Sequence, residues 1–114
     1  MDVKDVFVLE RIIDSCDDII KTIQKHGNTW EDFDADLEYQ YICAFLLIQI
    51  GEYVNELSVK FVHAHENIPW RNIVDMRNRL THRYGESSNP FIWQTINEDI
   101  KPLRDFCKQQ IAMQ

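Results

Sequence analysis

Apolar residues recur at steps of three and four along almost the whole chain, while glycine and proline, which interrupt such patterns, number only three each. This spacing places apolar side chains along one face of an α-helix. The runs predict helices over residues 3–26, 36–58, 70–83 and 90–112, with a short helix or turn over 59–65. The expected fold class is therefore all-α, an antiparallel four-helix bundle with extra short helices.

Polar segments between these runs indicate where helices begin and end. Gly27 is expected to stop the first helix, and Thr29 with Asp32 has the form of a capping box for a short turn. Residues 86–89 are expected to form a loop before the last helix. Pro102 is expected to kink that helix, because proline cannot donate a backbone hydrogen bond.

The size and charge of the chain limit what it can do. Its 114 residues, 45% of them hydrophobic, fit one domain over residues 1–114. The net charge of −7 argues against broad, sequence-blind binding to duplex nucleic acid, which needs many cationic phosphate contacts. The apolar stretches are too short to span a bilayer, and the acidic start is unlike a secretory signal. We therefore expect a cytoplasmic protein that makes no use of a membrane.

The residues that commonly hold metals do not form a convincing set. The three cysteines are odd in number and far apart, so they are expected to be reduced thiols of the core. His63 and His65 form a His-x-His pair, yet no cysteine or further histidine lies near them in the sequence. No metal site and no cofactor are therefore expected.

The segment 36–58 is apolar on more than one side, which indicates burial beyond contacts within its own bundle. Phe45 and Ile48 lie on the second side, and we expect them to contribute to a homodimer interface. Gly51 lies within this helix, where glycine costs about 1 kcal/mol relative to alanine. A close approach by a neighbouring helix would explain its presence.

Residues 77–84 read Arg-Asn-Arg-Leu-Thr-His-Arg-Tyr and concentrate basic and polar side chains on an acidic protein. Histidine can move a proton near neutral pH, and a guanidinium can hold a phosphate through two hydrogen bonds. This combination is typical of phosphodiester chemistry. A solvated, basic last turn of a helix is the simpler alternative. The candidate site residues in this segment are Arg77, Asn78, Arg79, His82, Arg83 and Tyr84.

Each candidate residue has an expected role in cleavage of RNA. His82 would transfer a proton, and Arg77 would stabilise charge that develops on phosphorus. Asn78 lies four residues before His82 and could orient its imidazole or bind phosphate. Arg79 and Arg83 are expected to position phosphate rather than to act as catalysts. One motif supplies one histidine, so a symmetric dimer would provide both a base and an acid.

The bundle with this motif resembles the HEPN superfamily, and more narrowly the HepT-like toxins that are paired with a minimal nucleotidyltransferase. Their signature is Arg-x4-His-x-Tyr, which is complete here at Arg77, His82 and Tyr84. Other family-like segments follow in order along nearly the whole chain, at Glu31-Asp32-Phe33, Ile50-Gly51-Glu52, Ile68-Pro69-Trp70 and Trp93. The resemblance implies the toxin of a type VII-like toxin–antitoxin system, acting as a homodimeric, metal-independent endoribonuclease on RNA.

The resemblance also implies that the nucleotidyltransferase partner neutralises the toxin by attaching AMP to Tyr84. Two alternatives remain open at this point. The chain could be a non-catalytic helical module that binds a nucleotide or the partner enzyme. It could also serve as the substrate of a nucleotidyltransferase that is itself the toxic component. Intact Arg77 and His82 favour the nuclease, because binding alone needs no titrating group.

Overall fold

The computed structural model describes residues 1–85 and 88–114, and the regular structure in these two ranges is entirely helical. The expected all-α fold class is therefore confirmed. No helix in these ranges is both long and apolar enough to cross a membrane. The helices, in chain order, are α1 (Val3–His26), α2 (Trp30–Asp34), α3 (Leu37–Glu56), α4 (Val59–Ala64), α5 (Trp70–Arg83), α6 (Ser88–Glu98) and α7 (Ile100–Ala112).

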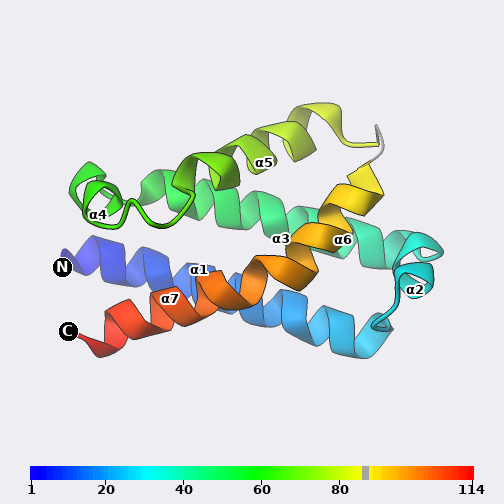
Figure 1. Ribbon diagram of the computed structural model, residues 1–114, viewed down its shortest axis with the longest axis horizontal. Helices are drawn as coiled ribbons and strands as arrows, with labels where there is room; N and C mark the ends of the chain where they lie inside the picture. The colour runs from blue at the N-terminus through cyan, green and yellow to red at the C-terminus, as the bar shows by residue number, and fades with distance from the viewer. Residues whose placement is uncertain (86–87) are drawn as a thin grey trace.

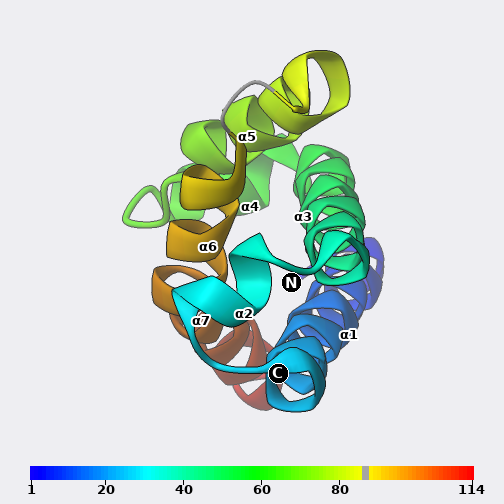
Figure 2. The same cartoon turned by 90° about the vertical axis from the view of Figure 1, so that its right-hand side faces the viewer.

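The long helices α1 and α3 lie antiparallel along the long axis of the molecule (Figure 1). Helix α5 packs on α3, and α7 packs on α1. Helix α6 runs diagonally from the end of α5 to the start of α7, as both views show (Figures 1 and 2). The helix carrying the basic motif is thus fastened mainly to α3, and its last turn lies at the end of the molecule opposite the two termini.

Side-chain caps begin four of these helices, α1 to α4. Asp2 accepts a hydrogen bond from the Lys4 backbone at the start of α1 (2.9 Å). Thr29 accepts from the backbone N–H of Asp32 (3.1 Å), as the capping-box pattern predicted. Such caps stabilise a helix by about 0.5–2 kcal/mol each. The predicted bounds of the first three helical segments are confirmed to within two residues.

Aromatic packing fastens the short helix α2 to the rest of the bundle. Phe33 is fully buried, and its ring centre lies 5.0 Å from that of Tyr39 and 5.4 Å from that of Trp93. The Tyr39 hydroxyl donates a hydrogen bond to the carbonyl of Gly27 (2.9 Å), which satisfies its polar end. The cluster therefore joins α2, α3 and α6 near the end of the molecule at which α5 terminates.

The last predicted helix is wrong in one respect, because residues 90–112 do not form one kinked helix. Two helices replace it, and the break falls at Asp99, three residues before Pro102. Proline lacks the N–H that would bond the carbonyl four residues earlier, which belongs to Glu98, and its ring crowds that carbonyl. Helix α6 accordingly ends at Glu98.

The predicted loop over residues 86–89 is wrong at the two positions that the structure describes. Residues 86 and 87 lie outside the described residues, while Ser88 and Asn89 already belong to α6. The Ser88 hydroxyl accepts a hydrogen bond from the backbone N–H of Gly85 (3.3 Å), which ties the start of α6 to the segment that follows α5.

The three cysteines are buried and unpaired, as the sequence predicted. Burial raises the pKa of the Cys43 and Cys107 thiols to about 12, and it raises the pKa of Cys16 as well. A thiol with a raised pKa is a poor nucleophile at neutral pH, because the thiolate is the reactive form. These residues therefore act as small apolar groups of the core.

Candidate functional site

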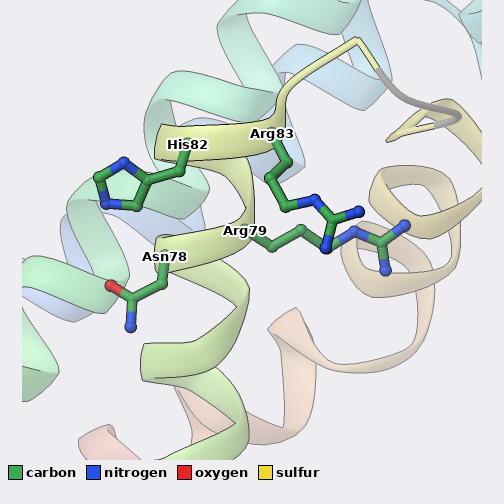
Figure 3. Close-up of a pocket in the computed structure, with 4 residues that line it drawn as sticks. All are labelled: Asn78, Arg79, His82 and Arg83. Atoms are coloured by element: carbon green, nitrogen blue, oxygen red, sulfur yellow. The ribbon is translucent and has the colours of Figure 1, made fainter.

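The last two turns of α5 present the basic motif to solvent. Asn78 and His82 project from one side of the helix, and Arg79 and Arg83 project from the other (Figure 3). This division follows from helix geometry, since residues four apart lie on the same face. The four side chains line a surface hollow of about 570 Å³.

The hollow is open and carries cationic groups, so it suits an anion better than an apolar ligand. Arg79 lies over the ring of Phe91, with its guanidinium carbon 4.6 Å from the ring centre. This contact fixes the arginine without using its hydrogen-bond donors on a carboxylate. The His82 ring makes no hydrogen bond within the described part of the chain, which leaves both ring nitrogens available to a ligand.

Arg77 is not part of the wall of this hollow. Its side chain turns toward α3, where it forms an ion pair and hydrogen bond with Glu52. The guanidinium also donates a hydrogen bond to the side-chain oxygen of Asn78 (2.6 Å), and Asn78 does line the hollow. Arg77 is therefore linked through Asn78 to the hollow that His82 lines.

Gly51 makes this position of Arg77 possible. A Cβ built on Gly51 would lie 2.2 Å from the Cβ of Arg77, far closer than two carbon atoms can approach. The close helix approach that the sequence predicted at Gly51 is thus confirmed, and its counterpart is the motif arginine itself. Glu52, the next residue, supplies the carboxylate that holds the guanidinium. The Ile-Gly-Glu segment of α3 and the motif of α5 form one structural unit.

Two contacts of the motif were not predicted from the sequence. The Asn78 oxygen accepts from Arg77, and the expected role of Asn78 in orienting the imidazole or binding phosphate stays a prediction. Arg77 is half-buried in an ion pair between helices. Sequence spacing could not reveal the second point, because the partner lies 25 residues away on another helix.

Tyr84 follows the last residue of α5 and is 36% exposed. Its ring centre lies 5.9 Å from that of Tyr41 on α3. Partial burial, with a smaller contribution from Tyr41, raises the pKa of the Tyr84 phenol, so the group remains protonated at neutral pH. Tyr41 carries no signal of this contact in the sequence, although it lies four residues before Phe45 on the exposed side of α3.

No group of three or more histidine, cysteine, aspartate or glutamate side chains converges on a common point within residues 1–85 and 88–114. His63 is exposed on α4, whereas His65 packs between the rings of Phe61 (4.5 Å) and Phe106 (5.2 Å). The two histidines therefore have separate surroundings. The groups available at the motif are protein acids, bases and cations.

Comparison with known proteins places this motif in a family. A candidate RNase of Caldanaerobacter subterraneus subsp. tengcongensis is 33% identical over 101 residues, covering 89% of this chain and 88% of that protein. A protein of Thermococcus cleftensis, described as a candidate ribonuclease HepT, is 35% identical over 75 residues, or 66% of this chain and 68% of the relative. A candidate RNase of Methanocaldococcus jannaschii is 30% identical over 84 residues, 70% of this chain and 69% of its own length.

No solved structure is significantly similar to the chain. The model of the ribonuclease HepT-like family matches residues 8–110, which include the whole of α3, α5 and the motif. The resemblance to HEPN proteins that the motif suggested therefore extends over nearly the full sequence. The chain belongs to the ribonuclease HepT-like family.

Proposed function

We propose that the protein is a metal-independent endoribonuclease in which Arg77 and His82 carry out the chemistry. Membership of the ribonuclease HepT-like family supports ribonuclease activity in general. The observation that carries the finer proposal is the anchoring of Arg77 by Glu52 and Asn78 beside the hollow that exposes His82. This arrangement provides a fixed cation and a free imidazole at one helix end.

The proposed reaction uses the ribose 2′-hydroxyl of the RNA as nucleophile. A base removes the 2′ proton while the 2′-oxygen forms a bond to phosphorus. The bond from phosphorus to the 5′-oxygen breaks, and an acid gives that oxygen a proton. His82 can serve in either proton transfer, an effect typically of about 10²–10⁴-fold in rate. Arg77 stabilises the negative charge that develops on the phosphoryl oxygens, while Arg79 and Arg83 position the flanking phosphates.

We further propose that the active form is a homodimer, in which the second His82 supplies the other proton transfer. An exposed apolar side chain on α3 supports this interface, because Phe45 is 59% exposed. Ile48 continues the same side and is half-buried. A Phe45→Glu variant would place a charge in this contact and is expected to sediment as a monomer. A wild-type protein that is monomeric at micromolar concentration contradicts the dimer.

The family resemblance supports a place for this enzyme in a cytoplasmic toxin–antitoxin pair. In this proposal a minimal nucleotidyltransferase neutralises the ribonuclease by transferring AMP to the Tyr84 hydroxyl, which is partly exposed. The added bulk and negative charge would oppose entry of an RNA backbone at the neighbouring hollow. Coexpression with the partner should add the mass of AMP to wild-type protein and not to Tyr84→Phe. Added mass at another residue contradicts the assignment.

The decisive experiment compares wild-type protein with His82→Ala. Wild-type protein should arrest growth when expressed alone and should cut single-stranded RNA in the presence of EDTA, and His82→Ala should do neither while keeping its helical circular dichroism. Cleavage that requires a divalent ion would overturn the metal-independent mechanism. Wild-type protein that binds nucleotides but cuts no RNA would favour a binding module instead.

A further inference from the structure

A second hollow lies on the other side of Tyr84, at the end of the molecule where α2, α3, α5 and α6 meet. Its volume is about 450 Å³. Three aromatic side chains from three different segments line it, namely Trp30, Tyr41 and Tyr84. We call this hollow the aromatic pocket. Tyr84 follows His82 by two residues in the chain, and no residue lines both the aromatic pocket and the hollow formed by the basic motif.

Specific contacts hold the walls of the aromatic pocket in place. Asn89 at the start of α6 donates a hydrogen bond to the carboxylate of Asp34 at the end of α2 (3.1 Å). Gln40 is buried and donates to the backbone carbonyls of Phe33 (3.0 Å) and Asp34 (3.1 Å). These bonds fix α2 against both α3 and α6. The pocket is therefore a preformed feature of the fold.

Gly85 lines the pocket beside Tyr84. Its φ of 96° turns the chain out of α5 in a conformation that other residues rarely adopt. Among the described residues other than its chain neighbours, none has an atom within 4 Å of the position where a Cβ would stand. The ring centres of Tyr84 and Tyr41 lie 5.9 Å apart with the rings tilted by 52°, so the two rings line the pocket side by side and a flat ligand can stack on them.

The charges of the pocket determine which part of a nucleotide can enter. Among the described residues that line the pocket, Asp34 is the only one with an acidic or basic side chain apart from the two tyrosines. A phosphate is therefore repelled from the aromatic pocket but accepted by the arginine-lined hollow next to it. An uncharged nucleobase can stack on an aromatic ring, which contributes about 1–3 kcal/mol per base.

The acceptor set of Asp34 further distinguishes among the bases. A carboxylate only accepts hydrogen bonds, and guanine presents two adjacent donors, N1–H and the exocyclic amino group. Adenine and cytosine present one amino donor beside a ring nitrogen that also accepts, and uracil places its single donor between two carbonyls. Only Oδ1 accepts from Asn89, and each carboxylate oxygen has two lone pairs, so Oδ1 and Oδ2 can together accept from both guanine donors.

We propose that the aromatic pocket binds one unpaired nucleobase of RNA, preferably guanine, through stacking with Tyr41 and Tyr84 and a hydrogen bond to Asp34. The inference rests on the proposed ribonuclease function, since the phosphate of the same nucleotide would occupy the hollow that His82 lines. It gives this enzyme a preference for cutting beside a guanine in single-stranded RNA. A base in this pocket would compete with any group attached to Tyr84.

The test measures binding separately from cleavage. Short 2′-O-methyl oligonucleotides lack the nucleophile and cannot be cut, so fluorescence anisotropy reports affinity for wild-type protein directly. The probes carry a single guanine, adenine or cytosine in an otherwise uniform uracil strand. The guanine probe should bind about tenfold more tightly than the all-uracil strand. Tyr41→Ala should weaken its binding about tenfold through loss of stacking, whereas Tyr41→Phe should retain it.

Asp34→Asn tests recognition of the base and can keep the bond with Asn89. It should abolish the preference for guanine, while Glu31→Gln, which removes a charge from the same helix outside the pocket, should preserve it. Circular dichroism confirms that each variant folds. Equal binding of all probes to wild-type protein, a preference for adenine, or a guanine preference that survives Asp34→Asn would each overturn the proposal.

The pocket and the ribonuclease function can fail independently. A guanine preference in binding without cleavage of any unmodified RNA would support the pocket and contradict the nuclease. Cleavage with no preference among bases, together with unchanged binding by Tyr41→Ala, would support the nuclease and contradict the pocket.

Discussion

Two arginines on opposite sides of the bundle form the same kind of ion pair between neighbouring helices. Arg77 on α5 pairs with Glu52 on α3, and Arg104 on α7 pairs with Asp17 on α1. Their side chains are almost equally exposed, at 27% and 28%. Ion pairs at such surfaces contribute only about 0–1 kcal/mol to stability. Pairing alone therefore does not mark Arg77 as a functional residue.

The second partner of each arginine distinguishes them. Arg104 also lies 3.6 Å from the carboxylate of Asp105, so two anions surround one cation. Arg77 instead donates to the neutral amide of Asn78, and the adjoining hollow carries two further arginines. Arg104 therefore has two carboxylate neighbours, and Lys21 and Lys101 line the same surface hollow. It forms an ion pair of the same kind outside the motif, which makes Arg104 a matched control for each test of Arg77.

The largest expected difference is in catalysis. Arg77→Ala should lower the rate of RNA cleavage about 10²–10³-fold, the effect typical of losing a group that stabilises charge in the transition state. Arg104→Ala removes a surface ion pair of similar exposure but no residue of the motif, so its cleavage rate should stay within about twofold of wild type. Single-turnover cleavage with both variants makes the comparison. Equal losses of cleavage rate in the two variants would show that the Arg77–Glu52 ion pair acts only by supporting the fold.

Gly51→Ala should disturb Arg77 without altering any charge. The new Cβ would overlap the Cβ of Arg77, which cannot rotate away, so α5 must shift on α3. Overpacking of this kind costs about 1–3 kcal/mol. Thermal unfolding should show that loss, and cleavage should fall by at least about tenfold. A variant with wild-type stability and activity would contradict the close contact.

Removal of the carboxylate partner should have a smaller effect. Glu52 positions Arg77 and does not contact substrate in the proposal, so Glu52→Gln should lower kcat about tenfold and change KM little. Glutamine can still accept a hydrogen bond from Arg77, so Glu52→Ala should lose more. Asp17→Asn is the matched control and should leave both constants near their wild-type values. An effect of Glu52→Gln on KM alone, or an equal fall in kcat from both substitutions, would argue against positioning.

The smallest effect concerns a carboxylate outside both ion pairs. Hydrogen bonds from the Tyr39 backbone and the His26 ring lower the pKa of Asp36. Because its pKa is lower in the folded state, the Asp36 carboxylate stabilises the folded protein at pH values above the usual carboxyl pKa. This contribution is lost as the pH falls through the pKa of Asp36 in the folded state. Asp36→Asn, which keeps a good capping residue, should therefore be less stable at neutral pH and converge with wild type in acid. A stability difference that does not depend on pH would show that the charge of Asp36 is not its cause.

Local signals predicted most of the fold. The spacing of apolar residues identified the long helices, and Gly27 with Thr29 marked the first boundary, because these features act within a few residues of the chain. The division of the last helix at Asp99 was missed, since the spacing of apolar residues continues across it. Proline acts on a carbonyl four residues earlier, so the break preceded Pro102 rather than coinciding with it.

The candidate site was predictable as a list of residues but not as an arrangement. The motif spacing singled out Arg77 and His82, whereas the direction of each side chain depended on contacts from other helices. Gly51 and Glu52 lie more than twenty residues earlier and decide where Arg77 points. Tyr41 lacked any local signal, because its role depends on Tyr84 lying beside it in space.

The buried cysteines have a practical consequence for spectroscopy. Because all three thiols are enclosed and resist ionisation, the native protein offers little to a thiol-reactive dye or spin label under mild conditions. A single cysteine introduced on the surface of α5 would then take the label alone, with no need to remove the native residues first. A second introduced cysteine on α1 would allow the distance between two labels across the bundle to be measured. Such a pair could follow movement of the motif helix when RNA or a partner binds.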